Sequence, residues 1–550
     1  MRLEEDFVNE WVYDCETSHE DDNYYVWLWC GVEVEGSGRA TGGDIESMME
    51  SLSNLDPHTR ALYHNLKFDG SYIINWLLNN KYKHTMSKNP QKGEFRTLIS
   101  EDRILYEIKI RFQNGRLITI WDSYKILPNS VSDLAKALGL EEGKLHIEHN
   151  IIRKPGSATE EEIKYCFRDC EIVARGLAMA RNDGLVKMTI GSSSLNKYKK
   201  SIGGEGTFRA LFPALDYDVD SYLRKAYRGG FVYVHPDRKK REVGAGIVLD
   251  YNSMFPWAMR YNPMPYGRPE YHSGKPVSGM WVARLHIGHA KLKRNHIPCI
   301  QIKHSRWNDT EYLEELEDAQ LFITNIDWEL ITEQYDLWDV SYYDYYQFHS
   351  AVGMFDEYID RLYKVKCDST GAIRYLTKIE LNSFYGKFGT NPVQVSLEPY
   401  IDGGLNFRKC QERITEGVYC PVAIYTTSYT RQKIIREAQK LYYRLLYIDT
   451  DSLHLLEDDI TGLDVDPKRL GALKLESKFV RAKYIRPKCY IEDEGGRLNV
   501  KCAGMPEAVK QTITFDQFRP GASFPGKLMR KEMKGGTALI ETTFTILDDE

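Results

Sequence analysis

Hydrophobic and polar positions along residues 1–190 switch repeatedly between the periods of strands and helices. The nearly continuous apolar run YYVWLWCGVEV (24–34) predicts a strand, and GSYIINWLL (70–78) predicts the start of a helix. Thr159 and Glu162 have the spacing of a capping box, which predicts a helix over EEIKYCFRDCEIVARGLAMA (161–180). Alternation of this kind is typical of a mixed α/β domain.

The remaining chain divides by composition. The Gly/Ser-rich stretches GSSS (191–194) and GGEG (203–206) indicate a boundary, and residues 195–260 carry strand signals. Residues 261–352 are rich in Pro, Tyr and Trp and are interpreted as an inserted domain. Residues 353–390 are helical with a break near 368–371, and residues 391–420 form a second insertion rich in turn signals. A helix is predicted over TTSYTRQKIIREAQKLYYRLL (426–446).

Length and composition indicate a globular protein of several domains. The chain has 550 residues, of which 42% are hydrophobic. No apolar run reaches the roughly 18 residues of a membrane span, and the first residues lack the pattern of a secretion signal. Ten cysteines occur without CxxC spacing, which favours buried thiols over zinc or disulfides. We therefore expect a reduced, cytoplasmic protein without membrane contact.

Charge is distributed unevenly. The net charge is -6, yet residues 1–60 hold 15 acidic and three basic side chains, whereas residues 467–534 hold 16 basic and seven acidic ones. Because counterion release depends on local charge, the basic region suits a surface that follows phosphates. An ordinary solvated surface explains the charge alone equally well.

Two aspartates interrupt the apolar stretch LLYIDTDSLHLL (445–456). Asp449 and Asp451 would lie at the turn of a hairpin, where a divalent cation could offset their repulsion. The stretch GIVLDYNSMFP (246–256) likewise ends an apolar strand in Asp250. Carboxylates at strand ends suit Mg²⁺, and two such ions would support in-line phosphoryl transfer. Taken singly, each aspartate is as readily a turn residue.

A third segment, RYLTKIELNSFYGKF (374–388), predicts a helix with a functional face. Arg374, Lys378, Asn382 and Tyr385 share that face, while Ile373, Leu376, Ile379 and Phe384 are expected in the core. Two cations, an amide and an aromatic ring suit a nucleoside triphosphate. The alternative is an amphipathic helix with a solvated basic face.

A second acidic set occurs in the N-terminal third. VYDCET places Asp14 and Glu16 on one face of a strand, HNLKFDG places Asp69 at a strand-to-helix junction, and YCFRD places Tyr165 and Asp169 on one helix face. If they converge, four carboxylates and a phenol would bind two metals and activate water against a phosphodiester. Individually, each acid is better explained as a solvated surface residue.

The motifs, in this order, resemble those of family B DNA polymerases. DYNSMFP (250–256) resembles motif A, KIELNSFYG (378–386) motif B, YIDTDS (447–452) motif C and IRPKCY (485–490) the KxY motif. HNLKFDG (64–70), YRGG (227–230), VKCAGM (500–505) and GGTALIETTFTI (535–546) narrow the resemblance to the protein-primed polymerases of phi-twenty-nine-type bacteriophages. The resemblance covers nearly the whole chain.

The resemblance implies roles in nucleotide addition. Asp250 and Asp451 would ligate two Mg²⁺ ions, for which Mn²⁺ can substitute, together with the carbonyl of Tyr251, and Asp449 would support the primer end. Lys366 and Lys378 would hold the triphosphate, and Asn382 and Tyr385 would contact the deoxynucleotide. Phe255 stands where the family has Tyr; a phenyl ring of similar volume should still exclude a ribose 2′-hydroxyl. Lys488 and Tyr490 would steady the primer, and Thr427 and Arg431 the template, although Thr430 replaces the Ala of that motif.

The resemblance also implies a DEDD-type 3′–5′ exonuclease. Asp14, Glu16, Asp69 and Asp169 would be its metal ligands, Tyr165 would orient the water, and Lys144 would be the catalytic lysine. The single strand would contact Thr17, His64, Asn65, Phe68, Ser123 and Tyr124. The loop Tyr227, Arg228, Gly229 and Gly230 would bind DNA and coordinate synthesis with editing.

The fold class implied is α+β multidomain: a ribonuclease H-like exonuclease domain and a right-hand polymerase with two insertions. The expected parts are the exonuclease domain (1–190), palm (191–260 and 421–500), first insertion (261–352), fingers (353–390), second insertion (391–420) and thumb (501–550). The resemblance implies a monomer that binds primer–template DNA, deoxynucleotides and a terminal priming protein. It also implies proofreading, processivity and strand displacement.

Two other functions are compatible with parts of the pattern. One is a nuclease whose C-terminal two thirds only bind DNA, which the presence of Asp250, Asp451, Lys378 and Tyr385 argues against. The other is an inactive DNA-binding protein, which the full set of expected metal carboxylates argues against.

Overall fold

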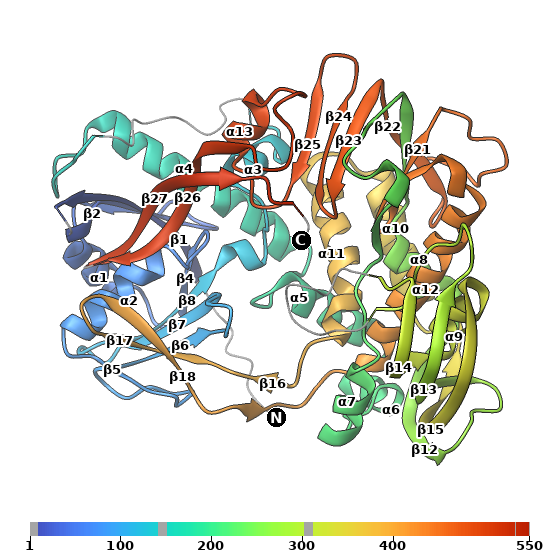
Figure 1. Cartoon of the computed structure of the whole chain (residues 1–550). Coiled ribbons are helices and arrows are strands. Elements are labelled where there is room, and N and C mark those ends of the chain that lie inside the picture. Colours follow the sequence, from blue (N-terminus) through green and yellow to red (C-terminus); the bar gives the residue numbers. More distant parts are fainter. Residues whose placement is uncertain (1–8, 22, 141–150, 302–311, 534, 549–550) are drawn as a thin grey trace.

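The computed structural model describes residues 9–21, 23–140, 151–301, 312–533 and 535–548 (Figure 1). Helices and sheets form several packed regions, so the coarse expectation of a mixed α/β multidomain protein is confirmed. None of the helices in the described residues is long and apolar enough to cross a membrane.

The N-terminal region is an eight-stranded sheet with helices on both faces. Its spatial order is β3-β2-β1-β4-β8-β7-β6-β5, with β1 parallel to β4. Helices α1 and α2 cover one face and α3 and α4 the other, each with its own apolar core. The elements are β1 (Asn9–Glu20), β2 (Asn23–Glu33), β3 (Arg39–Gly42), α1 (Ile45–Asn54), β4 (Thr59–Tyr63), α2 (Asp69–Asn79), β5 (Lys83–His84), β6 (Glu94–Ile99), β7 (Leu105–Arg111), β8 (Leu117–Asp122), η1 (Ser123–Lys125), α3 (Val131–Ala137) and α4 (Glu160–Asn182).

The predicted capping box begins α4. The Thr159 hydroxyl accepts a hydrogen bond from the Glu162 amide at 3.3 Å, and the Thr159 amide donates to the Glu162 carboxylate at 2.9 Å. These two bonds satisfy donors that a helix start otherwise leaves open.

The stretch GSSS (191–194), predicted to mark a domain boundary, is helical and not a flexible linker, and the boundary itself stays a prediction. Residues 191–194 lie inside helix α5 (Ile190–Ser201), which is followed by α6 (Glu205–Leu211) and α7 (Tyr217–Arg224). Ser193 and Ser194 are fully buried, and a Cβ added to Gly191 would lie 3.3 Å from the carbonyl of Ser383 on α11 (Gly371–Phe388). The small residues therefore serve close helix packing and not flexibility.

A five-stranded sheet lies in the centre of the C-terminal two thirds, in the order β22-β11-β21-β20-β9. Helices α10 and α11 are separated at residues 369–370, as the sequence predicts, and α12 precedes the hairpin of β20 and β21. The elements are β9 (Val232–Val234), η2 (Pro236–Arg238), β10 (Glu242–Val243), β11 (Gly246–Tyr251), α8 (Met254–Tyr261), α10 (Asp356–Asp368), α12 (Cys420–Lys440), η3 (Tyr442–Arg444), β20 (Leu445–Asp449), β21 (Ser452–Leu456) and β22 (Leu473–Phe479).

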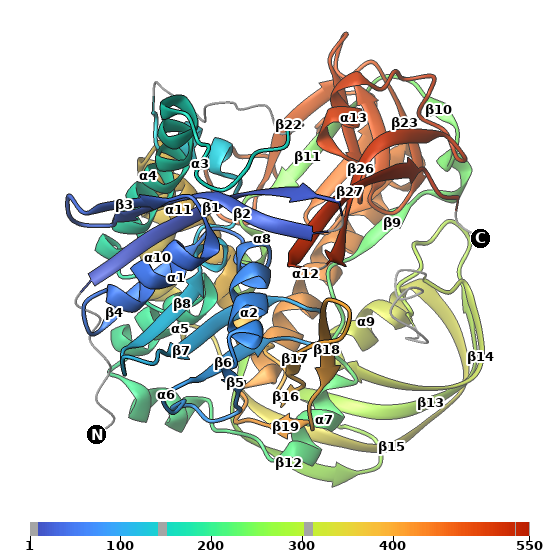
Figure 2. The ribbon, with the colours of Figure 1, turned by 90° about the vertical axis from the view of Figure 1, so that its left-hand side faces the viewer.

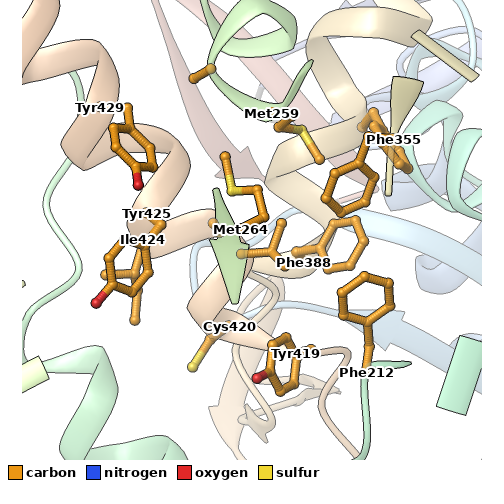
Figure 3. Packing of buried hydrophobic residues seen from close by; sticks show 14 of the residues in the cluster. Phe212, Met259, Met264, Phe355, Phe388, Tyr419, Cys420, Ile424, Tyr425 and Tyr429 are labelled. Carbon is orange, nitrogen blue, oxygen red and sulfur yellow. The ribbon is translucent and has the colours of Figure 1, made fainter. Parts of the chain in front are cut away.

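A large aromatic core joins these helices. Phe212, Phe355 and Phe388 pack against one another, and Tyr419, Ile424 and Met259 extend the cluster toward α12 and α8 (Figure 3). This core fixes the helices that carry functional side chains against one another.

Both segments predicted as insertions, called the first and second insertion below, form β-structure of their own. Residues 264–351 contain the sheet β12-β15-β13-β14, built from β12 (Met264–Ser273), β13 (Met280–Leu292), β14 (Glu315–Thr324) and β15 (Tyr335–Ala351), with α9 (Asn325–Gln334). Residues 393–414 contain β16 (Val393–Gln394), β17 (Leu397–Ile401), β18 (Leu405–Lys409) and β19 (Arg413–Ile414).

The C-terminal part reaches back to the N-terminal region. It consists of β23 (Arg481–Arg486), β24 (Cys489–Asp493), β25 (Leu498–Cys502), α13 (Glu507–Thr512), β26 (Ser523–Met533) and β27 (Gly536–Thr545). Hairpin β26–β27 lies beside β2 and α2 and also contacts β18 (Figures 1 and 2). At its tip a Cβ added to Gly536 would lie 2.3 Å from the Tyr72 ring, so glycine is needed for this close approach.

The second insertion also contacts the N-terminal region. Ser396 forms a β-bridge with Ser100, and the Lys409 ammonium lies 2.5 Å from the Glu101 carboxylate. Segments far apart in sequence, namely the N-terminal sheet, the second insertion and the C-terminal hairpin, thus contact one another in a chain (Figure 2).

Candidate active sites

The two aspartates on which the sequence argument depends meet at the end of the five-stranded sheet. Asp250 is the second-last residue of β11, opposite Ser452 of β21, and Asp451 lies in the turn immediately before Ser452. The Tyr251 amide donates to the Asp451 carbonyl at 2.8 Å, which locks the two strand ends together. Thr450 has a φ of 63°, a strained conformation for a β-branched residue that is typical of functional turns.

The carboxylates repel one another. The pKa of Asp451 is raised to about 7 by burial and then by the negative charges of Asp250 and Asp449. Two lysines offset this charge: the Lys474 ammonium lies 2.9 Å from an Asp250 oxygen, and Lys488 pairs with Asp449. Lys474 was not anticipated from the sequence.

The residues expected to face a nucleotide gather beside this turn. On α11, Lys378 and Asn382 are exposed, and the Tyr385 ring stacks on Phe255 with centroids 4.1 Å apart. The pKa of Tyr385 is raised to about 12, mainly by burial and also by Asp451. Leu376 and Phe384 enter the core as expected, but Ile373 is 51% exposed, whereas its neighbour Ala372 in the same first turn of α11 is buried.

Lys366 approaches from α10. Its ammonium donates to the Ser253 hydroxyl at 2.8 Å. The pKa of Lys366 is lowered to about 8, first by burial and then by the charges of Lys474 and Lys378. Lysines from three different elements therefore lie around one small volume.

The two KxY residues differ in exposure. Lys488 is exposed, has a φ of 59° and donates its amide to the Tyr447 phenol at 2.9 Å. Tyr490 is buried and packs against Tyr447 and Tyr484, with which its ring forms one cluster. Lys488 can therefore contact a ligand directly, whereas Tyr490 fixes strand β24, which follows the turn that carries Lys488.

Thr427 and Arg431, expected to contact DNA, are buried on α12. The Thr427 hydroxyl donates to the carbonyls of Ala423 and Ile424, as hydroxyls inside helices commonly do. Arg431 pairs with Asp327 of α9 at 2.8 Å and donates to the carbonyls of Arg228 and Gly229 at 2.9 and 3.0 Å. Arg431 thereby anchors the YRGG loop, and contact of these two side chains with DNA stays a prediction.

The loop YRGG lies against the hairpin turn. Tyr227 is half-buried beside Gly389, where an added Cβ would lie 2.7 Å from its phenol oxygen. A Cβ added to Gly230 would lie 2.6 Å from Cγ2 and 2.9 Å from Oγ1 of Thr450. Glycine is therefore required where this loop touches the residue between Asp449 and Asp451.

Replacing Gly230 with alanine is expected to slow primer extension. Thr450 cannot yield without moving the hairpin, and small misplacements of reacting groups can cost about a hundredfold in rate. Single-turnover extension measures the effect. Gly244→Ala is the control, because nothing lies within 4 Å of the Cβ it would add. Equal rates for both variants would contradict this role of Gly230.

The N-terminal acidic residues lie around β1 and its neighbours. Asp69 begins α2, is buried and accepts a hydrogen bond from the Cys15 thiol at 2.9 Å. Burial raises the pKa of Asp69 to about 7. Burial and the charges of Asp69 and Asp14 raise the pKa of Cys15. Burial, Asp14 and Asp169 likewise raise the pKa of Cys170 to about 12. The charge of Asp14 thus affects the pKa of both thiols. The charge of Asp69 also affects Cys15, and the charge of Asp169 also affects Cys170.

The other residues of the N-terminal acidic set lie on the strand and the helix that the sequence predicts. Glu16 precedes a β-bulge at Glu16/Thr17 in β1, and Tyr165 and Asp169 lie one turn apart on α4, both buried. The Thr17 side chain hydrogen-bonds Tyr72. Lys144, the expected catalytic lysine, lies outside the described residues.

The expected single-strand contacts divide into exposed and structural ones. His64 bonds the Ser123 hydroxyl at 3.1 Å and the Asn129 carbonyl at 2.7 Å, and Ser123 is fully buried. These bonds hold both side chains in the loop framework, in which His64 is half-buried. Tyr124 is 36% exposed and edge-on to His64, and Phe68 is half-buried against Tyr72. Both rings are placed where a base could stack.

Asp122 is an organising residue that the sequence argument did not include. It is buried and accepts hydrogen bonds from the amides of Asn65, Leu66 and Tyr124, so it joins the two loops. Asn65 has a φ of 71°, a conformation that asparagine tolerates better than most residues. The only sequence signal was an aspartate directly before Ser123.

The carboxylate oxygens of Asp250 and Asp451 suit magnesium, although these side chains alone do not supply a full set of metal ligands. Among described residues no group of three or more His, Cys, Asp or Glu side chains is arranged to hold a metal ion. Asp250 and Asp451 supply hard oxygens, and burial together with the charges of Asp250 and Asp449 raises the pKa of Asp451. Mg²⁺ commonly binds one or two carboxylates and completes its shell with waters and substrate phosphates, so the residues fit that ion.

This geometry agrees with comparison to known families. The model for "DNA polymerase type B, organellar and viral" matches residues 54–159 and 154–464. The chain therefore belongs to the organellar and viral type B DNA polymerases.

Within that family the similarity is to phage enzymes of the phi29 type, as the motifs predicted. The chain is 37% identical to the DNA polymerase of Bacillus phage phi29 over 97% of this chain and 99% of the relative. It is 36% identical to that of Bacillus phage Nf and 34% to that of Streptococcus phage Cp-1, over 97% and 98% of this chain and 98% of each relative.

Solved structures give the same result. Phi29 DNA polymerase complexed with primer–template DNA and incoming nucleotides matches with a TM-score of 0.92 and 35% identity, over 98% of this chain and 100% of that one. The complex of the same polymerase with single-stranded DNA matches with a TM-score of 0.91 and 34% identity, over the same shares.

Proposed function

We propose that this family B polymerase replicates DNA from a protein primer by two-metal nucleotidyl transfer and edits its product with a 3′–5′ exonuclease. The observation that carries the proposal is the meeting of Asp250 and Asp451 at one sheet edge, beside Lys366, Lys378 and the stacked Phe255 and Tyr385 rings. Membership of the type B family supports the polymerase activity.

In this mechanism Asp250, Asp451 and the Tyr251 carbonyl would hold Mg²⁺, and Asp449 would support the primer end through Lys488. When bound, the ions would activate the primer hydroxyl and neutralise charge on the transferred phosphoryl group. Lys366 and Lys378 orient the triphosphate, and Asn382 and Tyr385 hold the sugar and base. Buried Tyr490 and Arg431 act by fixing the elements that carry Lys488 and the YRGG loop.

Editing would use the N-terminal set. Asp14, Glu16, Asp69 and Asp169 would bind the metals that activate water, with Tyr165 and Lys144 assisting. Thr17, Asn65, Phe68 and Tyr124 would receive the frayed single strand, on a loop framework held by His64 and Ser123. The match to the phi29 polymerase complexed with single-stranded DNA is consistent with such a contact.

The regions would correspond to an exonuclease domain, a palm, fingers and a thumb, with insertions at 261–352 and 391–420. The first insertion would face the terminal protein and duplex. The contacts of the second insertion with the N-terminal region and with β26 support a closed path around DNA, which would give processivity and open downstream duplex. We further propose that the protein acts as a monomer in the host cytoplasm.

The test is an assay with a labelled primer–template, Mg²⁺ and deoxynucleotides. Extension with nucleotides, degradation without them, and nucleotide attachment to the candidate terminal protein are the expected results. Degradation without extension would instead identify a nuclease that binds DNA, and neither activity would identify a structural DNA-binding protein.

Phe255→Val is expected to admit ribonucleotides. The Phe255 ring is stacked on Tyr385, and a smaller side chain leaves room for a 2′-hydroxyl. Discrimination between dGTP and GTP, measured as the ratio of kcat/KM, should fall by one to two orders of magnitude, roughly what a pocket gains from a few buried methylenes. Phe255→Tyr, which keeps the ring, is the control. Easy ribonucleotide incorporation by the unmodified protein would contradict the role of Phe255.

A further inference from the structure

Strand β22 contains one residue more than its partner β11 next to the catalytic edge. Val248 pairs with Ser477, but the following pairs are Leu249 with Leu475 and Asp250 with Lys474. The residue skipped is Glu476. Without this bulge Leu475 would lie opposite Asp250. Bulges beside active sites commonly re-aim a side chain, and this one places a lysine where the unshifted register places a leucine.

Lys474 contacts Asp250 directly. Residues opposite one another on antiparallel strands share a face, and the Lys474 Nζ lies 2.9 Å from the Asp250 Oδ2. The Lys474 side chain is 37% exposed, and ion pairs this exposed to solvent contribute little to folding. Stability is therefore a weak explanation for the lysine, and its position at the site calls for another.

Lys474 also lies close to other cations. The pKa of Lys366 is lowered first by burial and then by the charges of Lys474 and Lys378. Lys366 comes from α10, Lys378 from α11 and Lys474 from β22, so three separate elements direct ammonium groups at one volume. Like charges gathered in this way repel one another unless an anion is bound among them.

We propose that Lys474 is a further triphosphate-binding residue of the nucleotide site: it neutralises Asp250 in the substrate-free protein and exchanges that partner for the β- and γ-phosphates of an incoming nucleotide. The inference rests on the proposed polymerase function and names a residue that none of the sequence motifs includes.

The exchange needs only side-chain rotation. A lysine ammonium is a compact charge on a flexible stem with three donors, so it can move between an aspartate and a phosphate oxygen without moving β22. When the Lys474 ammonium leaves Asp250, both carboxylate oxygens of Asp250 become available as metal ligands. The same ammonium then pairs with the phosphates of the nucleotide. Binding of the nucleotide and release of the Asp250 carboxylate for metal binding are thereby linked.

The experiment compares Lys474→Ala with Lys474→Arg and with Lys478→Ala. Lys478 lies on the same strand and forms a similar exposed pair with Asp458 at 3.0 Å, away from the nucleotide site. Steady-state extension gives kcat and the KM for the next nucleotide. Inhibition by inorganic tripolyphosphate tests the phosphate contact without base or sugar.

A binding measurement makes the result independent of turnover. Gel retention detects the complex of protein, next nucleotide and a primer that ends in a dideoxynucleotide through a phosphorothioate linkage, which blocks extension and degradation. Thermal unfolding of each variant reports its stability.

Lys474→Ala is expected to raise the KM, the nucleotide Kd and the tripolyphosphate Ki each by roughly tenfold, the usual scale for loss of one charge-assisted contact. The kcat should change less than about threefold, since binding and not the chemical step is affected. Lys474→Arg should recover most of the loss, and Lys478→Ala should match the unmodified protein.

Unchanged KM, Kd and Ki in Lys474→Ala overturn the inference, as does a lower melting temperature with unchanged nucleotide binding, which identifies a structural pair. Both outcomes leave the polymerase function intact, provided that the unmodified protein extends primers. Failure of the unmodified protein to extend any primer overturns the function itself.

Discussion

Asp451→Ala is expected to abolish primer extension while leaving degradation of single-stranded DNA intact. Asp451 lies in the turn between β20 and β21, linked through the Tyr251 amide to the end of β11. Its removal takes away a carboxylate from the pair with Asp250 that would hold the metal ions. Losing a group on which two-metal catalysis depends should lower the extension rate at least about a thousandfold.

The variant should fold normally. The pKa of Asp451 is raised to about 7 by burial and by its neighbours, so its charge is unfavourable in the metal-free protein and alanine relieves repulsion. Single-turnover extension, nuclease rate and thermal unfolding are measured together. Asp458→Ala is the matched control, because Asp458 is an exposed carboxylate beyond β21 that pairs with Lys478. Extension by Asp451→Ala within tenfold of that control would remove the basis for the polymerase site.

The double variant Asp14→Ala, Asp69→Ala should give the converse result, with editing lost and synthesis kept. Asp69 is buried at the start of α2, and Asp14 lies on β1 within electrostatic reach of the same thiol, Cys15. Removing two of four expected metal carboxylates should lower exonuclease activity by roughly a thousandfold or more. Primer extension on matched termini should stay within about threefold, since neither residue belongs to the five-stranded sheet.

Degradation of a labelled single strand and extension from a mismatched terminus measure this separation. Asp56→Ala is the control, because Asp56 is an exposed residue just before β4. A double variant that still removes a mismatch at the control rate would place the nuclease activity elsewhere. Parallel loss of extension would indicate that the two regions cannot be separated by mutation.

Local patterns in the sequence predicted much of the molecule. The capping box at Thr159, the break between α10 and α11, and the hairpin that presents Asp449 and Asp451 occur as expected. Each depends on residues near one another in the chain, where spacing and turn chemistry act directly. The helical structure of GSSS was not predicted, because a run of small residues can be a flexible linker or a close helix contact, and only packing against α11 distinguishes the two.

Motif residues were harder to assign than motifs. Thr427, Arg431, Ser123 and Tyr490 were all expected to meet DNA, yet all four are buried. A family motif can include residues that position a loop as well as residues that touch a ligand. Arg431, with one guanidinium bonded to Asp327 and to the YRGG loop, is the clearest example.

The sequence by itself determined the order of elements, the positions of the acidic turns and the family to which the chain belongs, because periodicity, capping and motif spacing are local properties. Only the tertiary structure decided that Lys474 faces Asp250, that Gly230 touches Thr450 and that the second insertion contacts both the N-terminal region and the C-terminal hairpin. Strand register and contacts between distant segments follow from the packing of the whole chain, where a one-residue bulge changes which side chain faces the site.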